Sequence, residues 1–348
     1  MDKLFKILAI LLLIQTLSCQ KMKEVPVWNP SICQPNRASG RGDLSVVIGP
    51  NSITTLEGND AGLPDLDSSG SWGDSGKVFT DMHGTPIAAD VIYFSHYEDK
   101  YYHVKINFDV EFMKKVLAEI HYTDEFQIYE PNQTNPSGVG KLGCFDQLIF
   151  GFAPQGMVVV WRGYSGYRIE IGRYQAEIIK DDKELEKNMF PPEGMSRKDV
   201  VAMYTLPEPA TCEKWDLYRK RYNLKVETIS ENKGFKLFEV DTENYNGEYF
   251  YEYRPKILTS NYENRALFRK IHLSWETGIE QRYASDIFFN EKKIFEKFKD
   301  VKPEQKLDLK IKIAENNGSI ELLLNNEPIE VDSIRIWKHE FDYKDSYR

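Results

Sequence analysis

Oxygen-bearing side chains are spaced as in a calcium-binding loop within one Gly- and Ser-rich segment. Asp65, Asp67 and Ser69 occupy alternate positions and precede Gly70. Calcium loops place oxygen ligands at positions 1, 3 and 5, ahead of a glycine that makes a sharp turn. Position 12, where a bidentate glutamate should close the shell, is Gly76 here. Because the ligand set is incomplete, we interpret the segment as a solvated loop, with calcium binding as the alternative.

Two histidines, His96 and His103, lie in neighbouring aromatic runs and could bring imidazole groups together. Residues 91–108 hold two aromatic and β-branched runs separated by an acidic pair, a pattern typical of a β-hairpin. A turn at the acidic pair would place His96 opposite Tyr101. It would also place His103 opposite Phe94, so that the imidazoles would be diagonal neighbours on one face. Two ligands fall short of a zinc site, and we expect a half-exposed aromatic face without metal.

A serine between glycines and a histidine near an aspartate are residue types that serine hydrolases use. Residues 163–166 (GYSG) are close to the G-x-S-x-G nucleophile elbow, but Tyr167 replaces the last glycine. The segment also joins two predicted antiparallel strands, whereas the elbow needs a turn from a strand into a helix. Asp81 and His83 could act only if a nucleophile converged on them. We therefore predict no enzyme and keep a hydrolase, using scattered acids with His83 or His103, as the alternative.

Arginine and aromatic side chains gather around the strands predicted at residues 157–161 and 167–171. On the second strand, Arg168 and Glu170 alternate with apolar residues and share one face. Ordinary sheet statistics favour a solvated face with cross-strand ion pairs. The alternative is a partner-binding surface, because Trp, Tyr and Arg carry much of the binding energy at interfaces. The candidate residues of that surface are Trp161, Arg162, Tyr164, Arg168 and Arg173.

The chain starts like an exported protein. Lys3 and Lys6 form a short basic start, residues 4–14 are almost continuously apolar, and residues 16–18 (TLS) lead to Cys19. A basic start, an apolar run and a small residue are typical of a secretory signal. A cysteine directly after the small residue resembles the bacterial lipobox, whose thiol is diacylated. Since the run is shorter than the ~20 residues needed to span a membrane, we predict a signal peptide over residues 1–18 and lipid attachment at Cys19.

Composition limits the partners of the chain. It holds 54 acidic and 45 basic residues, with a net charge of −9, which argues against nucleic acid and against docking on anionic lipid. Membrane contact would therefore depend on the acyl chains of Cys19, and we expect no cofactor. With Cys19 lipidated, at most one disulfide could join two of the remaining cysteines, and the sequence leaves open whether it forms. Those cysteines are Cys33, Cys144 and Cys212.

The pattern of apolar residues predicts a β-rich α+β fold: an antiparallel meander sheet with one or two packed helices, followed by a smaller, mostly β domain. Residues 157–161 (MVVVW) lack polar alternation, so we expect a central strand covered on both faces. The other elements expected before residue 225 are a tether at 19–40, a first strand at 44–48, the hairpin at 91–108, a helix at 110–120 capped by Asp109, strands at 148–152 and 167–171, and a helix at 213–222.

Beyond residue 226 the chain alternates Lys, Glu and Asn with aromatic residues in short strands. Strands at 307–314 and 319–324 flank an Asn-Asn-Gly turn, a good hairpin signal. A third strand is expected at 329–337. We therefore predict one domain over residues 41–225 and a second over residues 226–348.

Four segments carry a resemblance to a known family. They are SWGDSG (71–76), MVVVWRG (157–163), YRIEIGRYQA (167–176) and WDLYRKRYN (215–223). In this order they resemble the bacterial lipoprotein family catalogued as domain of unknown function 2931, over about residues 25–225. The resemblance implies an accessory protein anchored in the cell envelope, and it brings no catalytic residues. Proteins of this kind sometimes sit beside secreted antibacterial toxins, which makes immunity a candidate role.

These observations together predict an outer-membrane lipoprotein of a Gram-negative bacterium that faces the periplasm or the cell surface. We expect the protein to bind another protein. Immunity against a secreted toxin is one form of this function. A hydrolase of envelope glycan or lipid is the first alternative. A structural component of the envelope is the second.

Overall fold

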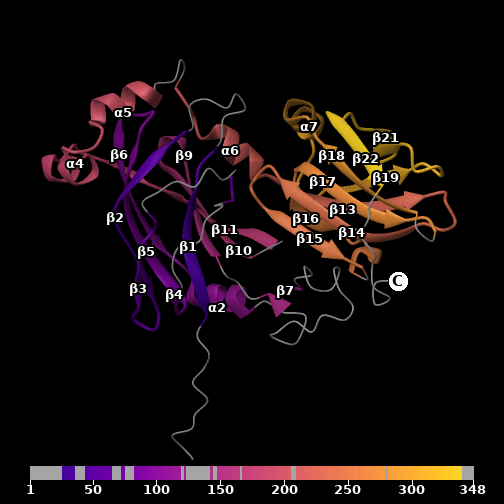
Figure 1. Cartoon of the computed structure of the whole chain (residues 1–348), viewed down its shortest axis with the longest axis horizontal. Coiled ribbons are helices and arrows are strands. Elements are labelled where there is room, and N and C mark those ends of the chain that lie inside the picture. Colours follow the sequence, from indigo (N-terminus) through magenta and orange to yellow (C-terminus); the bar gives the residue numbers. More distant parts are fainter. Residues whose placement is uncertain are drawn as a thin grey trace, which may run out of the picture.

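The computed structural model describes residues 26–35, 44–64, 72–74, 82–118, 121–122, 142–143, 147–164, 167–204, 209–254, 256–278 and 281–338. They form two β-rich lobes side by side, an N-terminal lobe in indigo to magenta and a C-terminal lobe in orange to yellow (Figure 1). The β-rich α+β class predicted from the sequence is confirmed. No helix among the described residues has both the length and the apolar character needed to cross a membrane.

Two sheets face each other in the N-terminal lobe and bury apolar side chains between them, among them Ile53, Val91, Phe150 and Val158. One sheet consists, in spatial order, of β12 (Glu177–Ile179), β6 (Lys100–Asn107), β5 (Pro86–Ser95), β2 (Val46–Thr55) and β3 (Asp60–Ala61). The facing layer consists of β11 (Tyr167–Gln175), β10 (Met157–Tyr164), β9 (Gln147–Ala153), β1 (Val27–Cys33) and β4 (Met82–His83). A separate short pair joins β7 (His121–Tyr122) to β8 (Leu142–Gly143).

Helices cover this lobe where the sequence supplies an apolar stripe. α2 (Val110–Ala118) buries Met113 and Leu117 against the core and begins after Asp109, whose carboxylate accepts a hydrogen bond from Phe112 N. The predicted helix and its cap are confirmed. Leu185 of α4 (Lys183–Met189) packs with Val201 of α5 (Arg197–Tyr204) against aromatic side chains of β5 and β6.

The meander predicted from the apolar runs is confirmed. β9, β10 and β11 are antiparallel neighbours, joined first by a 3-10 turn, η1 (Pro154–Gly156). All five residues of 157–161 are fully buried, because β10 is paired on both edges and covered on both faces, as its unbroken apolar sequence predicts.

The tether predicted over residues 19–40 is wrong for residues 27–33, which form β1. This strand pairs in parallel with β9, and Trp28 and Ile32 are buried in the core. Pro30, which argued for a tether, is tolerated because β4 pairs only with Val27 and Trp28, so the other edge carries no ladder bond at Pro30 among the described residues.

The hairpin of residues 91–108 exists, but the predicted register is wrong by two residues. Phe94 lies opposite Tyr101, and His103 lies opposite Ile92. The loop is longer than expected because Asp99 adopts a positive φ of 52° and the strand pairing ends at Ser95. The two histidines are therefore not diagonal neighbours.

The C-terminal lobe is a second sandwich. Its first layer consists of β16 (Glu263–Ala266), β13 (Arg221–Ser230), β19 (Lys306–Ile313), β20 (Ile320–Leu324) and β21 (Glu327–Pro328). The facing layer consists of β22 (Ser333–Lys338), β18 (Arg282–Phe288), β17 (Phe268–Glu276), β14 (Lys236–Asn244) and β15 (Tyr249–Tyr253). The lobe also contains α7 (Glu291–Phe298) and a 3-10 turn, η2 (Lys256–Leu258).

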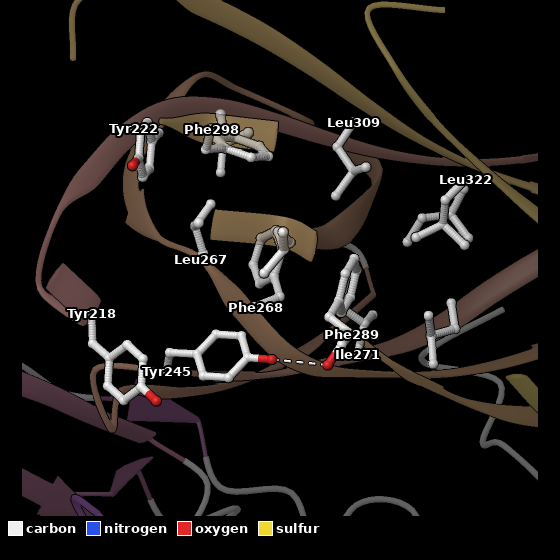
Figure 2. Close-up of a cluster of buried hydrophobic side chains, with 14 of the residues drawn as sticks. Tyr218, Tyr222, Tyr245, Leu267, Phe268, Ile271, Phe289, Phe298, Leu309 and Leu322 are labelled. Atoms are coloured by element: carbon white, nitrogen blue, oxygen red, sulfur yellow. Dashed lines mark hydrogen bonds between the residues drawn. The ribbon is translucent and has the colours of Figure 1, made fainter. Parts of the chain in front are cut away.

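Aromatic and aliphatic side chains fill this lobe (Figure 2). Phe268 and Ile271 of β17 pack with Phe298 of α7 and Leu309 of β19, and all four are nearly inaccessible to solvent. Tyr245 keeps its polar end satisfied by donating a hydrogen bond to Phe289 O at 2.8 Å. Burial on this scale supplies the main stabilisation of the lobe.

The Asn-Asn-Gly hairpin is confirmed as β19 and β20, with Asn317 at a positive φ of 60°. The strand expected at residues 329–337 is confirmed as β22, but it pairs with β18 and does not extend the hairpin. β21 takes the place beside β20.

One ten-stranded sheet passes through both lobes, because β11 pairs with β15 at Tyr167–Phe250 and Arg168–Tyr249. The domain boundary predicted at residue 225 is wrong, because it falls inside β13. The chain passes between the lobes earlier, at α6 (Glu213–Tyr218), which is shorter than the helix predicted at 213–222.

Candidate functional site

The partner surface predicted around β10 and β11 is wrong for two of its five residues. Trp161 is fully buried and donates a hydrogen bond from Nε1 to Asn246 O at 3.1 Å. Arg162 is 2% exposed and donates to Val116 O at 2.8 Å. Neither side chain can contact a partner, and the side chain of Tyr164 lies outside the described residues.

The two remaining arginines of that surface are held by intramolecular contacts. Arg168 donates from Nε to Gly247 O at 2.6 Å, and its side chain is 16% exposed. Arg173 pairs with Asp216 of α6 at 3.2 Å. Arg168 therefore connects β11 to the C-terminal lobe, and Arg173 connects it to α6. Both arginines stabilise the fold.

The solvated strand face expected for Arg168 and Glu170 is also wrong. Glu170 is 8% exposed and pairs with Arg219 at 2.7 Å. Beside it, Glu248 is 2% exposed and accepts two hydrogen bonds from Arg221, at 2.6 and 3.0 Å. We name Arg168, Glu170, Arg219, Arg221 and Glu248 the junction network, because they connect β11 to the start of the C-terminal lobe.

The tryptophans of the sequence resemblance meet in the same region. Trp72 packs edge-on against Trp161 at 4.9 Å and approaches Trp215 at 6.3 Å. Gly73 and Gly247 have φ values of +85° and +88° and touch backbone to backbone, where a Cβ on either would lie within 3 Å of the other. The motif residues therefore serve close packing between the lobes.

The structure tests few of the other sequence-derived site residues. Asp65, Asp67, Ser69, Asp81, Ser165, Cys144 and the lipidation residue Cys19 lie outside the described residues. Cys33 and Cys212 do not form a disulfide with each other, which excludes one of the pairings left open. His103 contacts Asp90 at 2.6 Å, and burial lowers the pKa of His96 to about 4.

A different cluster of titratable groups lies on the C-terminal part of the ten-stranded sheet. Glu239 and Asp241 come from β14, His272 from β17 and Asp286 from β18. We name these four residues the acidic–histidine cluster. Asp241, His272 and Asp286 are consecutive cross-strand partners, so their side chains share the face opposite Ile271 and Leu273, which face the core.

A β-bulge between Leu237 and Glu239 brings Glu239 into the cluster, opposite Ser274. Bulges shift the phase of a strand and redirect a side chain, and they are common next to functional sites. The ligand-capable atoms of Glu239, Asp241 and His272 all lie within 4.8 Å of one another.

Hydrogen bonds fix the imidazole of this cluster. His272 Nδ1 lies 2.8 Å from Asp286 Oδ1, and His272 Nε2 lies 3.2 Å from Ser274 Oγ and 3.8 Å from Glu239 Oε1. A carboxylate accepts the Nδ1 proton, which leaves Nε2 as the basic nitrogen. That nitrogen faces Glu239.

The cluster is poorly solvated and holds excess negative charge. Glu239 is 6% exposed, and the side chains of His272 and Asp286 are 17% and 19% exposed. Burial, and then the charge of Glu239, raises the pKa of Asp241 well above its usual range. Burial opposes ionisation of Asp286 as well, but hydrogen bonds from His272 and Lys270 lower its pKa.

The contacts from Asp286 through His272 to Ser274 have the order of a Ser-His-Asp catalytic triad. Ser274 is fully buried, so its hydroxyl cannot reach a substrate in this structure. The separated pKa values of Asp241 and Asp286 do resemble an acid–base pair.

Aromatic and cationic side chains border the cluster, two of them exposed and two half-buried. Trp337 of β22 is 40% exposed and lies 5.7 Å from the His272 ring. On the same face, Arg335 and Lys270 lie over the Phe288 ring, at 5.6 and 5.7 Å from its centroid. We name Lys270, Phe288, Arg335 and Trp337 the β22 rim.

The acidic–histidine cluster could hardly be predicted from sequence patterns. Its residues alternate with apolar ones, which is the pattern of any half-exposed strand. Glu239 and Asp286 are far apart in sequence, and only long-range strand pairing joins them. The one local signal is the spacing of His272 and Ser274 on the same face of a strand.

The clefts found among the described residues are not better candidates. One of about 110 Å³ lies between β13 and β14 and is lined by Thr228, Thr242 and Arg265. Pockets for small molecules are usually about 300–1,000 Å³, so this cleft is too small for a substrate. A hollow of about 470 Å³ beside Tyr102 and Glu177 is large enough, but its lining supplies one carboxylate and no histidine, cysteine or serine.

The sequence model of a family described as "Protein of unknown function (DUF2931)" matches residues 18–208. The match ends before α6, so it covers the N-terminal lobe and none of the acidic–histidine cluster. No curated protein and no solved structure matches the chain.

Proposed function

The chain belongs to the DUF2931 family, and we propose that it is a lipid-anchored protein of the bacterial cell envelope that binds another protein. The lipid is carried by Cys19, at the end of the signal-like segment 1–18. A secreted antibacterial toxin is the partner class to test first. The binding surface that we assign is the β22 rim.

The exposure of Trp337 on an edge strand carries this proposal. Trp337 is 40% exposed, and Arg335 is exposed on the same face of β22. Tryptophan and arginine are the residues most enriched among interface hot spots. β22 is also the last strand of its sheet among the described residues, and an edge strand can accept a further strand from a partner.

The charge around the rim favours specific recognition. Lys270 pairs with the partly exposed Asp286, and Arg335 lies opposite Asp286 on the neighbouring strand, so a partner meets both signs of charge within one small area. Complementary charges at an interface increase the association rate and exclude wrong partners. The junction network offers no such surface, because its charged groups are paired between the lobes.

Site-specific photo-cross-linking in intact cells tests the assignment. A photoreactive phenylalanine analogue placed at Arg335 should capture one stoichiometric protein partner. The same analogue at Phe112, an aromatic residue of α2 with a similar exposure of 42%, should not capture it. Trp337→Ala should abolish capture from position 335, whereas Phe112→Ala should leave it unchanged.

The anchor is tested in the same cells. Cys19→Ser should move the protein from the membrane fraction to the soluble fraction. A partner captured equally from both positions would overturn the assignment of the β22 rim. Failure to capture any envelope or toxin protein would overturn the binding function, and equal solubility of both forms would overturn the lipid anchor.

A further inference from the structure

We propose that the acidic–histidine cluster is a binding site for one divalent transition-metal ion, with Glu239, Asp241 and His272 as its ligands and Zn²⁺ as the best fit. The site is independent of the partner proposed for the β22 rim. Three features support it: the geometry of the three ligands, the carboxylate that holds the histidine, and a buried carboxylate oxygen of Asp241 that accepts no hydrogen bond.

The ligand atoms are already gathered. The three lie within 4.8 Å of one another, and His272 Nε2 and Glu239 Oε1 are 3.8 Å apart. Ligands on a tetrahedral zinc ion, with bonds of ~2.0–2.1 Å, lie roughly 3.3–3.4 Å from each other. Side-chain rotations would close the difference while the strands stay in place.

The histidine is held as metal-bound histidines are. His272 Nδ1 contacts Asp286 Oδ1 at 2.8 Å, which directs the basic Nε2 toward Glu239. In metal sites a carboxylate commonly accepts the second ring N–H, fixes the tautomer and raises the basicity of the ligand. Lys270 Nζ, 3.0 Å from Asp286, holds that carboxylate in turn.

Hydrogen bonds within the protein do not satisfy the carboxylate of Asp241. Its Oδ1 is buried and lacks a hydrogen-bond partner, while Oδ2 has only a long contact of 3.4 Å from the Tyr249 hydroxyl. A buried, unsatisfied carboxylate oxygen is costly. A cation bound between Asp241 and Glu239 would satisfy this oxygen and cancel their mutual repulsion.

The ligand set selects the class of ion. One imidazole and two carboxylates suit Zn²⁺ and its neighbours in the first transition row. Calcium requires ~6–8 oxygen ligands and magnesium a near-ideal octahedron of oxygens, which these three residues do not supply. Three protein ligands also leave one coordination position of a tetrahedral ion open.

Titration calorimetry on the full chain, purified in detergent and freed of metal by chelator, tests the site with Zn²⁺ alone. We expect one ion per chain with a dissociation constant in the micromolar range or tighter. Asp241→Asn and His272→Gln should each weaken binding by at least about 100-fold. Asp286→Asn, which keeps all three ligands but weakens the support of His272, should weaken binding about 10–100-fold.

His103→Gln is the matched control. His103 also contacts an aspartate, Asp90, at 2.6 Å, but further carboxylates do not complete a metal-binding group with it among the described residues. This variant should bind Zn²⁺ like the wild type. Circular dichroism shows that each variant is folded, and Co²⁺ bound in place of Zn²⁺ should give a tetrahedral absorption spectrum that His272→Gln loses.

The outcomes separate cleanly. Absence of stoichiometric binding to the folded wild type would overturn the site. Equal binding by Asp241→Asn and the wild type would assign the ion elsewhere and overturn it as well. Because Trp337→Ala leaves all three ligands in place, its Zn²⁺ affinity should be unchanged, so failure of the partner experiment leaves this result standing.

Discussion

The junction network and the acidic–histidine cluster are both groups of charged residues withdrawn from water, and they differ in how the charge is balanced. In the junction network three arginines face two glutamates, and Glu248 accepts two hydrogen bonds from Arg221. In the cluster three carboxylates face one lysine and one histidine, and an oxygen of Asp241 is left without a partner.

The difference indicates which region is devoted to the fold and which is available for function. Buried charges are tolerated when they are paired and hydrogen-bonded, as at the junction between the lobes. A buried group with a strongly shifted pKa and incomplete pairing is retained at a cost and is a candidate for binding. The family match covers Glu170 of the junction but ends before the cluster.

The largest expected effect is on the junction side. Glu248→Gln removes the charge that neutralises Arg221 in a position that is 2% exposed. We expect the free energy of unfolding to fall by roughly 2–3 kcal/mol, because breaking a buried ion pair leaves the other charge unpaired. Chemical denaturation monitored by tryptophan fluorescence measures this loss.

Glu263→Gln is the control for this change, because Glu263 pairs with Arg265 but is 50% exposed. Exposed ion pairs contribute about 0–1 kcal/mol, so this variant should stay close to the wild type. Equal destabilisation by the two substitutions would show that the junction pair is not set apart by burial.

A smaller effect of opposite sign is expected in the cluster. In metal-free protein at neutral pH, Asp241→Asn should raise the free energy of unfolding by about 1 kcal/mol, because it removes a buried, repelled charge while keeping the shape. Added Zn²⁺ should reverse the order and favour the wild type, since a bound ion stabilises only the state that binds it.

The stability advantage of Asp241→Asn over the wild type should depend on pH. The folded-state pKa of Asp241 is raised by burial and by Glu239, so its contribution to stability is fully present below the unfolded pKa of about 4 and is lost as the pH rises through the folded pKa. The advantage of Asp241→Asn should therefore widen from acidic to neutral pH. An advantage independent of pH would contradict the shifted pKa.

Local patterns predicted the elements that depend on local physics. The unbroken apolar run at 157–161 identified a central strand, the helical spacing of Met113 and Leu117 identified α2, and Asn-Asn-Gly identified the hairpin of β19 and β20. Each is fixed by side-chain periodicity or by turn chemistry, which a short window of sequence contains.

The sequence-based predictions were wrong where contacts between segments far apart in the chain determine the structure. Arg168 and Glu170 alternate with apolar residues as on a solvated face, yet the C-terminal lobe covers them. The prolines near β1 predicted a tether, but at Pro30 the strand is paired only with β9 among the described residues, so the missing N–H of proline is tolerated. The site residues Asp241, His272 and Asp286 meet only through the order of β14, β17 and β18, which no local window contains.

The smallest expected effect compares two histidine–aspartate pairs with different surroundings. The His103–Asp90 contact is short, at 2.6 Å, but the side chains are 25% and 50% exposed. The His272–Asp286 contact is more deeply buried and adjoins Glu239.

A double-mutant cycle of His103→Gln with Asp90→Asn should give a coupling free energy below about 0.5 kcal/mol that falls as salt is added. The equivalent cycle of His272→Gln with Asp286→Asn in metal-free protein should give a larger value with little salt dependence, because burial limits screening. Equal coupling in the two cycles would mean that geometry alone sets the strength of these pairs. Unbalanced, buried charge would then no longer distinguish the acidic–histidine cluster from an ordinary surface ion pair.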